Sequence, residues 1–175
     1  VLFVPATNGA FTPYMGTLPE GESNFRYYRL QNRGVVGPRG LPLLKPPYTT
    51  NTDFDMNKGE ILWQVPNGDR MARVEEHPAL EGIDLPPLGG GGRHPVLVTS
   101  TLLIHGQDMG YGPNLIARDK TTGEEISRIE LQGAPQSAPM SYAVDDRQYI
   151  ALGVNDAPTP KLVVFALPTS SDKSE

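Results

Sequence analysis

An all-β fold is predicted for this chain of 175 residues from three features of its sequence. Its apolar residues fall in short runs rich in Val, Ile, Leu and Thr, which have the length and composition of strands. The chain contains 19 Gly and 18 Pro, well above the usual combined share of about 12%, which indicates many turns between short elements. A strand–turn–strand pattern also occurs twice.

Short strands joined by tight turns are expected along most of the chain. Gly59 and Gly123 each follow polar residues at a turn, where Gly adopts the positive φ that a hairpin needs. Asp145 and Asp146 are expected to turn a third hairpin. The expected strands cover residues 1–4, 48–55, 60–65, 96–100, 101–105, 114–119, 125–131, 140–144, 148–152 and 162–167. The first of these is expected to be buried.

Two long stretches that are rich in Pro and Gly interrupt this pattern, at residues 5–47 and 66–95, and are expected to be loop insertions. Loops of this length inside a compact domain are usually functional or inserted. Residues 73–80 can form one or two helical turns, interrupted at Pro78. Residues 169–175 form a polar tail without apolar side chains to bury.

The repeated unit is centred on a turn. This turn runs from Asp55 to Glu60 in the first copy and from Asp119 to Glu124 in the second, with Asp and Gly at the same positions. Repeated strand pairs are typical of propeller blades, small sheets packed around a central axis, which in the best-known kind recur about every 40–45 residues. The two copies of the turn lie further apart along this chain than the usual repeat, which is consistent with the insertion at 66–95.

Charge and composition argue against several classes of partner and site. The net charge is −5, and basic residues do not cluster, so a nucleic acid is not an expected partner. No apolar run approaches the roughly 18 residues that a membrane helix requires. The chain has no Cys, which excludes disulfides and thiolate metal sites.

A run of four glycines, Gly89–Gly92, precedes Arg93 and His94. It is not a phosphate-binding P-loop, because no Lys followed by Ser or Thr comes after it. Two interpretations remain open, a flexible turn or a place where the backbone approaches a cofactor closely.

Other polar and aromatic residues have a structural interpretation beside a functional one. Asp53 and Asp55 could be a carboxylate pair or calcium ligands, but the repeat favours Asp55 as a turn residue. Trp63 could stack on a substrate, but its place in the repeat favours packing between blades, where it is expected to be largely buried. His77 and His105 have no partner at ligand spacing and are interpreted as structural.

The repeats resemble the tryptophan-docking motif of quinoprotein dehydrogenases, Ala-x-Asp-x-x-x-Gly-Lys/Glu-x-x-Trp. The first copy has Asp55, Gly59 and Trp63 and lacks only the leading Ala. The second copy has Asp119 and Gly123 after Ala117, with Ser127 in place of Trp.

Three further segments are similar to the glucose-dehydrogenase-like branch of that family. Gly40–Tyr48 resembles the approach to its penultimate outer strands. Ala138–Tyr142 with Arg147–Ile150 resembles its last hairpin, and Val164–Pro168 resembles the close of its chains.

The resemblance implies the C-terminal portion of an eight-bladed β-propeller with pyrroloquinoline quinone (PQQ) and Ca²⁺ on its axis. About two to two and a half four-stranded blades are expected, from residues 1–65, 96–131 and 139–167. In the family the missing strand of the last blade comes from the N-terminal region. The main partner of this chain would therefore be the remaining, upstream part of the propeller.

The resemblance also implies the activity of the whole protein, oxidation of an alcohol or of a sugar such as a glucose-like polyol in the periplasm. Electrons would pass through PQQ to a quinone or cytochrome acceptor. The family's catalytic residues and Ca²⁺ ligands lie upstream, so none is assigned here, and the isolated chain is expected to be inactive. The expected cofactor contacts are Gly90, Gly91, Gly92, Arg93, His94, Asn155 and Asp156. The alternative is a non-catalytic propeller scaffold.

Overall fold

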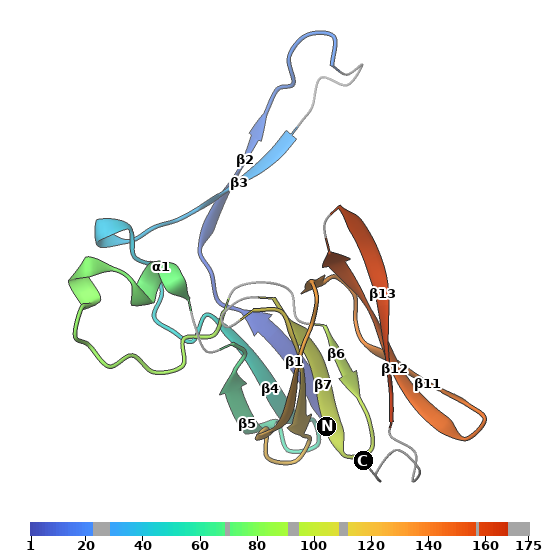
Figure 1. Ribbon diagram of the computed structural model, residues 1–175. Coiled ribbons are helices and arrows are strands. Elements are labelled where there is room, and N and C mark those ends of the chain that lie inside the picture. The colour runs from blue at the N-terminus through green and yellow to red at the C-terminus, as the bar shows by residue number, and fades with distance from the viewer. Residues whose placement is uncertain (23–28, 69–70, 91–94, 109–111, 157, 168–175) are drawn as a thin grey trace.

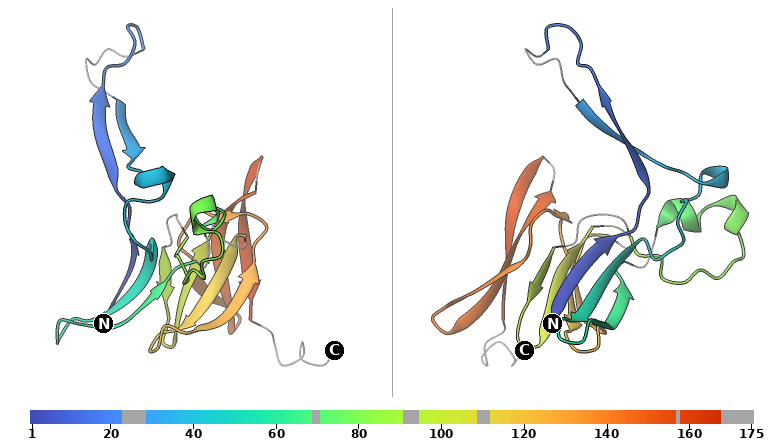
Figure 2. Two further views of the ribbon diagram at one scale, coloured as in Figure 1. Left: turned by 90° about the vertical axis from the view of Figure 1, so that its left-hand side faces the viewer. Right: turned by 180° about the vertical axis from the view of Figure 1, so that it is seen from behind.

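The computed structural model describes residues 1–22, 29–68, 71–90, 95–108, 112–156 and 158–167. Within these residues three antiparallel sheets follow one another along the chain, as expected for an all-β protein. A two-stranded hairpin projects from the first sheet, away from the other two (Figures 1 and 2).

The first sheet has the order β1–β4–β5. Its strands are β1 (Leu2–Thr7), β4 (Thr49–Asp55) and β5 (Glu60–Pro66). The expected first strand is present and extends to Thr7, but the expectation that it is buried was wrong. Its side chains are exposed or half-buried, because among the described residues β1 pairs on one side only, with β4.

The second sheet is a four-stranded meander with the order β6–β7–β8–β9. Its strands are β6 (Val96–Val98), β7 (Leu102–Gln107), β8 (Asn114–Asp119) and β9 (Glu125–Glu130). All four lie within one or two residues of the expected ranges. The inner strand β7 is buried along most of its length, whereas the outer strand β9 is largely exposed.

The third sheet is built on β12, which pairs with all three other strands. Its strands are β10 (Ala134–Pro135), β11 (Met140–Val144), β12 (Arg147–Asp156) and β13 (Thr159–Ala166). The β11–β12 turn is formed by Asp145 and Asp146, both with positive φ (49° and 62°), as a two-residue hairpin turn of the primed kind requires. β12 is longer than expected because β13 pairs with it as far as Asp156.

The expectation that residues 5–47 are mostly loop was wrong in part. β2 (Phe11–Gly16) and β3 (Arg29–Gly34) form the projecting hairpin. Pro13 has no N–H to donate to a neighbouring strand. It is tolerated because each strand of this ribbon has one partner in the described structure, so the other edge of the strand needs no N–H donor. The remaining regular pieces of the two insertions are single turns, η1 (Pro38–Gly40), α1 (Ala72–Glu75) and η2 (Pro78–Leu80).

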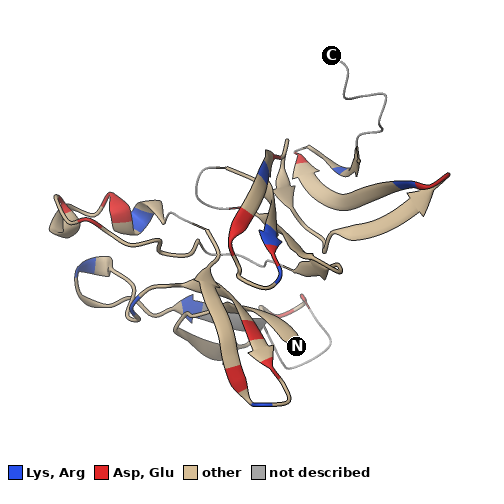
Figure 3. Cartoon of the chain, turned by 90° about the horizontal axis from the view of Figure 1, so that it is seen from below, with Lys and Arg blue, Asp and Glu red and all other residues tan. Residues whose placement is uncertain are grey.

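No helix in the described ranges is long and apolar enough to span a lipid bilayer. Figure 3 shows Lys and Arg scattered among Asp and Glu along the strands and turns, and the helical insertion carries both signs.

Two apolar clusters hold the structure together. The larger one lies between the second and third sheets and contains Ile104, Leu115, Leu131, Leu152 and Val154, each at most 4% exposed. The smaller one joins the two insertions and contains Tyr48, Met71, Val74 and Leu88. The insertions therefore pack against each other and have a small core of their own.

The repeated turn has the same geometry in both copies. Asp55 Oδ1 accepts hydrogen bonds from the N–H groups of Asn57 (2.9 Å) and Lys58 (3.2 Å). In the second copy Asp119 Oδ1 accepts from Thr121 (2.7 Å) and Thr122 (3.0 Å). The Gly that closes each turn has positive φ, 72° at Gly59 and 77° at Gly123. The Asp carboxylates thus serve the turn, as the repeat indicated for Asp55.

Trp63 connects the first sheet to the second. Its indole N–H donates to the Lys120 carbonyl (3.1 Å), and its ring lies against Gly123 so closely that a Cβ there would be 2.7 Å from Trp63 Cε3. We expected this side chain to be largely buried, but it is half-buried. The reason is that β5 is the outer strand of its sheet, and most of its side chains are exposed.

The two equivalent glycines provide a matched test of this contact. Gly123→Ala places a methyl group against the indole, whereas Gly59→Ala meets no atom within 4 Å, and both positions have the same backbone strain. We expect Gly123→Ala to lower the free energy of unfolding by about 1–3 kcal/mol more than Gly59→Ala does, as overpacking typically costs. Urea unfolding of both variants measures the difference. Equal losses would show that Trp63 does not pack on Gly123 in solution.

Candidate functional site

Five connections between strands, the two long insertions among them, leave the sheets at one end, which we call the loop end (Figure 1). They are the connections β1–β4, β5–β6, β7–β8, β9–β10 and β12–β13. The opposite end carries only the short turns, including the two that contain Asp55 and Asp119. Since binding residues are disproportionately found on loops positioned by a rigid scaffold, the loop end is the candidate functional region.

A row of buried polar side chains lies where the first sheet faces the second, near the loop end. On β4 and just after β5 these are Thr49, Asn51, Asp53 and Asn67, each at most 2% exposed. On the second sheet His105 and Gln107 are fully buried, and Arg118 is 8% exposed. We call these seven residues the polar seam. The interface between the second and third sheets, in contrast, is apolar.

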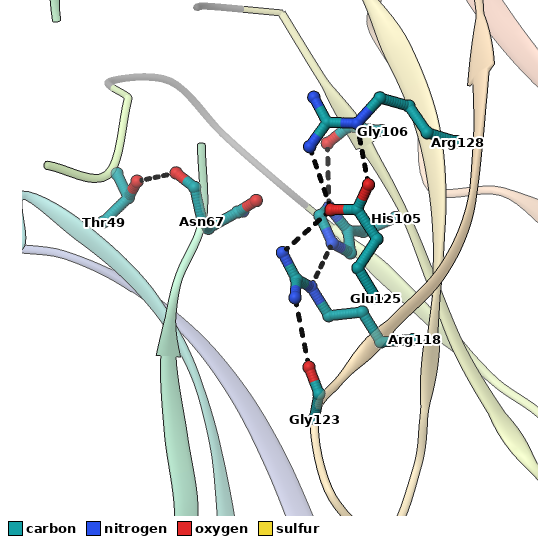
Figure 4. A network of polar contacts seen from close by, with 8 residues as sticks. All are labelled: Thr49, Asn67, His105, Gly106, Arg118, Gly123, Glu125 and Arg128. Carbon is teal, nitrogen blue, oxygen red and sulfur yellow. Dashed lines mark hydrogen bonds and ion pairs between the residues drawn. The ribbon is translucent and has the colours of Figure 1, made fainter. Parts of the chain in front are cut away.

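An ion network occupies the second-sheet side of the polar seam (Figure 4). Arg118 Nε donates to His105 Nε2 (3.3 Å), and Arg118 NH1 donates to the Gly123 carbonyl (3.1 Å). Glu125 accepts two hydrogen bonds from Arg128 (2.8 and 2.9 Å) and lies 3.7 Å from Arg118. Because a guanidinium can only donate, His105 Nε2 must be the unprotonated ring nitrogen.

The two carboxyls of this region are shifted in opposite directions. Hydrogen bonding to Arg128, assisted by the charges of Arg128 and Arg118, lowers the pKa of Glu125 below its usual 4.5. Burial raises the pKa of Asp53, and the positive charges of the N-terminus and Lys120 offset only part of that effect. Glu125 therefore stabilises the folded chain as an anion, whereas ionisation of Asp53 opposes folding.

Thr49 holds the start of the glycine run against the first sheet. Its hydroxyl is within hydrogen-bond distance of two carbonyl oxygens, those of Asn67 and Gly90, and can donate to one of them at a time. Gly89 has φ +70°, and a Cβ there would be 2.4 Å from the Thr49 carbonyl oxygen. Close backbone approach thus explains this glycine, and the approaching group is the protein itself.

The amides of Asn51 and Asn67 are buried without a protein partner among the described residues. The same holds for Asp53 Oδ1. A buried polar group left unpaired costs about 1–3 kcal/mol.

Of the seven expected cofactor contacts, Gly90, Asn155 and Asp156 are described, and these three lie at the loop end. Gly90 is buried beside Thr49 and Asn67, and its N–H donates to the Asn67 carbonyl (2.9 Å). Asn155 and Asp156 end β12 in the third sheet, where Asn155 pairs with Ala134 and Pro160. Asp156 forms an ion pair with Lys161. Gly91, Gly92, Arg93 and His94 lie outside the described residues.

The other two histidines have structural contacts. His77 Nδ1 accepts from the Ala79 N–H (3.1 Å) at the start of η2, and its Nε2 contacts the Arg39 carbonyl (2.9 Å). His105 contacts Arg118 within the polar seam.

Sequence reasoning did not find the polar seam. Its signal was nevertheless present, because Thr49–Asp53 is a strand of five polar residues without one apolar side chain. A strand of polar residues that lies between two strands with apolar residues is expected where a sheet buries hydrogen-bonding side chains.

Comparison with known proteins gives the family. A family model described as "PQQ: Glucose/ethanol/alcohol dehydrogenase, beta-propeller domain" matches residues 12–150. The chain belongs to this family. Its three sheets are accordingly successive blades of a partial β-propeller, the second with four strands in meander order and the first with three.

Several proteins of known function are similar to this quinoprotein propeller chain. The glycerol dehydrogenase large subunit of Gluconobacter thailandicus is 32% identical over 141 residues, covering 74% of this chain and 18% of that protein. The quinoprotein glucose dehydrogenase of Gluconobacter oxydans is 29% identical, covering 77% and 18%. The quinate/shikimate dehydrogenase (quinone) of Acinetobacter baylyi is 27% identical, covering 74% and 16%.

Among solved structures, a quinohemoprotein alcohol dehydrogenase from Comamonas testosteroni matches with a TM-score of 0.50 and 20% identity. The match covers 87% of this chain and 20% of that one, and it supports the fold alone. The chain spans about a fifth of the length of these relatives or less.

The described residues of this quinoprotein chain contain no group of three His, Asp or Glu side chains that could hold a metal ion. The space that a Cβ would take at Gly89 is filled by Thr49, so this glycine does not form an open cradle. The described residues by themselves thus do not form a Ca²⁺ site of carboxylate or imidazole ligands.

Removing the Thr49 hydroxyl tests its role at the loop end. Thr49→Val keeps the shape of the side chain but leaves the carbonyl groups of Asn67 and Gly90 without this buried donor. We expect the free energy of unfolding to fall by about 1–3 kcal/mol. Denaturant unfolding measures the loss, and Thr49→Ser, which retains the hydroxyl, is the control. If Thr49→Ser is as destabilised as Thr49→Val, the hydroxyl is not the stabilising group.

The lowered pKa of Glu125 predicts a pH-dependent contribution to stability. The contribution is complete above the usual pKa of 4.5 and is lost as the pH falls through the lower folded-state value. We therefore expect the free energy of unfolding of wild type to exceed that of Glu125→Gln by up to about 1 kcal/mol at pH 7. This is the range that exposed ion pairs typically contribute. The difference should shrink below pH 4.5.

Urea unfolding of both proteins between about pH 3 and pH 7 checks this prediction. Glu124→Gln removes the same charge from an exposed neighbouring position and is the matched control. A gap between wild type and Glu125→Gln that stays constant down to pH 3 would contradict it.

Proposed function

We propose that this chain is the C-terminal part of the propeller of a PQQ-dependent dehydrogenase that oxidises a hydroxyl group of a polyol or sugar. The match of residues 12–150 to the PQQ dehydrogenase propeller is the observation that carries the proposal. The relatives act, by name, on glycerol, glucose, and quinate or shikimate. Each of these compounds carries several hydroxyl groups, so a polyhydroxylated substrate is the class that they share.

In this proposal the chain contributes structure more than chemistry. When bound, PQQ accepts the two electrons from the substrate, and a quinone or cytochrome of the respiratory chain then receives them. The residues of this chain pack three blades together and direct their long connections to one end. Gly90–His94 and the end of β12 at Asn155 and Asp156 would face the cofactor there. The catalytic base, its cationic partner and the Ca²⁺ ligands would come from the remaining propeller.

The docking role of the repeated motif belongs to the same proposal. The contact of Trp63 with Gly123 and Lys120 supports it for the first and second blades. Ser127 occupies the equivalent position of the second repeat and is exposed, so the second and third blades rely on their apolar core instead. This difference is the specific observation that favours the alternative, a propeller retained as a non-catalytic scaffold.

A periplasmic location is part of the proposal, because the respiratory acceptors of such enzymes are reached from that compartment. Fractionation of cells that produce the full-length protein, with detection by an antibody to this chain, tests the location independently of activity.

Dye-linked activity assays separate the enzyme from the scaffold. We expect the full-length protein, supplied with PQQ and Ca²⁺, to reduce an artificial electron acceptor with glucose, glycerol or quinate. The 175-residue chain alone should show no turnover above background, because no catalytic residue is assigned to it. Turnover by the isolated chain would contradict the proposal that the catalytic residues come from the remaining propeller. A folded full-length protein that binds PQQ but oxidises no polyol would favour the scaffold.

A further inference from the structure

A pocket of about 180 Å³ lies at the base of the β2–β3 hairpin, between the two insertions. The ends of the hairpin form one wall, and Val35 and Val36 belong to it. Leu43 and Leu44 of the first insertion and Met71 of the second complete an apolar lining. Among the described lining residues, the only charged side chain is that of Arg73 in α1, and none carries a carboxylate.

The walls of this pocket are joined by hydrogen bonds rather than left as a gap between loops. The N–H of Val35 donates to the Ala10 carbonyl (2.8 Å) across the base of the hairpin. The N–H of Asn8 donates to the Tyr48 carbonyl (2.7 Å). The second insertion is tied to the first by the contact of His77 Nε2 with the Arg39 carbonyl (2.9 Å). The lining is therefore preorganised, which lowers the cost of binding a ligand.

Two polar residues, Tyr48 and Arg73, belong to the lining of this pocket. Tyr48 is only 7% exposed, whereas Arg73 is exposed. Burial raises the pKa of the Tyr48 hydroxyl, and the positive charge of Arg73 partly opposes that shift. The pocket is thus bordered by one residue with a cationic group and one with a hydroxyl group, and both groups can donate to an anionic oxygen.

We propose that this pocket binds a small organic monocarboxylate with a compact apolar body. The carboxylate would accept hydrogen bonds from Arg73 and Tyr48, and the body would lie against Val35, Leu44 and Met71. A guanidinium matches the planar geometry of a carboxylate and can bind it with two parallel bonds. An inorganic anion would make no apolar contacts with the lining, and a neutral ligand would offer no negative charge to the Arg73 guanidinium.

The size of the pocket limits the ligand to about one ring. An apolar cavity of about 150 Å³ accommodates benzene, so 180 Å³ is suited to a benzoate-sized molecule. The site is distinct from the proposed dehydrogenase site, because its lining comes mainly from the insertions and not from the strands that direct the loops toward the propeller axis.

Titration with benzoate tests the proposal in the full-length protein without PQQ, so its result is independent of the proposed dehydrogenase activity. Isothermal titration calorimetry measures the affinity, and the methyl signal of Met71 in an NMR spectrum reports the place of binding. We expect Arg73→Gln to weaken benzoate binding at least about tenfold and Tyr48→Phe about threefold to tenfold, as loss of charged and neutral hydrogen bonds implies. Benzamide, which has the same ring without the charge, should bind at least about tenfold more weakly than benzoate.

Arg39→Gln is the matched control, because it removes a nearby exposed positive charge that does not line the pocket. It should leave the affinity for benzoate unchanged. The proposal is overturned if benzoate does not bind at about 10 mM, if benzamide binds equally well, or if Arg73→Gln has no larger effect than Arg39→Gln. Arg73 is exposed, so its substitution should not unfold the protein, and circular dichroism of each variant verifies this.

Discussion

The first sheet is held in place by two close approaches at glycines, one to the second sheet and one to the β5–β6 connection. At the turn end, the Trp63 ring lies where a side chain at Gly123 would otherwise be. At the loop end, Gly89 allows the backbone to reach Thr49, whose hydroxyl lies within hydrogen-bond distance of the Gly90 and Asn67 carbonyls. Between these two points lies the polar seam. Gly123 therefore permits the contact of Trp63 with the second sheet, and Gly89 permits the contact of the β5–β6 connection with β4.

The interface between the first and second sheets differs in chemical character from the interface between the second and third sheets. Between the second and third sheets, Ile104, Leu115 and Leu152 form an apolar core that needs no exact partner for each atom. On the second-sheet side of the polar seam, Arg118, Glu125 and His105 are paired with one another in a defined geometry. The first sheet is linked to the second by Trp63, whose indole N–H donates to the Lys120 carbonyl.

The insertions are more than long connections between blades. They share the apolar cluster around Tyr48 and Leu88, and they enclose the pocket that contains Arg73. Tyr48 links this cluster to the propeller, since its N–H donates to Leu88 and its carbonyl accepts from Asn8. A propeller blade can therefore carry a second binding region without any change in its four-stranded framework.

Local sequence determined much of this protein. The Asp–Gly turns at Asp55 and Asp119, the Asp145–Asp146 hairpin and most strand positions follow from short-range preferences of backbone and side chain. The repeat of these turns predicted stacked blades, and the docking motif together with three further segments carried the resemblance to the family. What only the tertiary structure decided was which residues face one another across sheets. Burial of Thr49, Asn51 and His105, and the presence of Tyr48 and Arg73 in the lining of one pocket, depend on contacts between segments far apart in the chain. No local pattern encodes such contacts, because hydrogen-bond partners and packing neighbours are chosen by the fold as a whole.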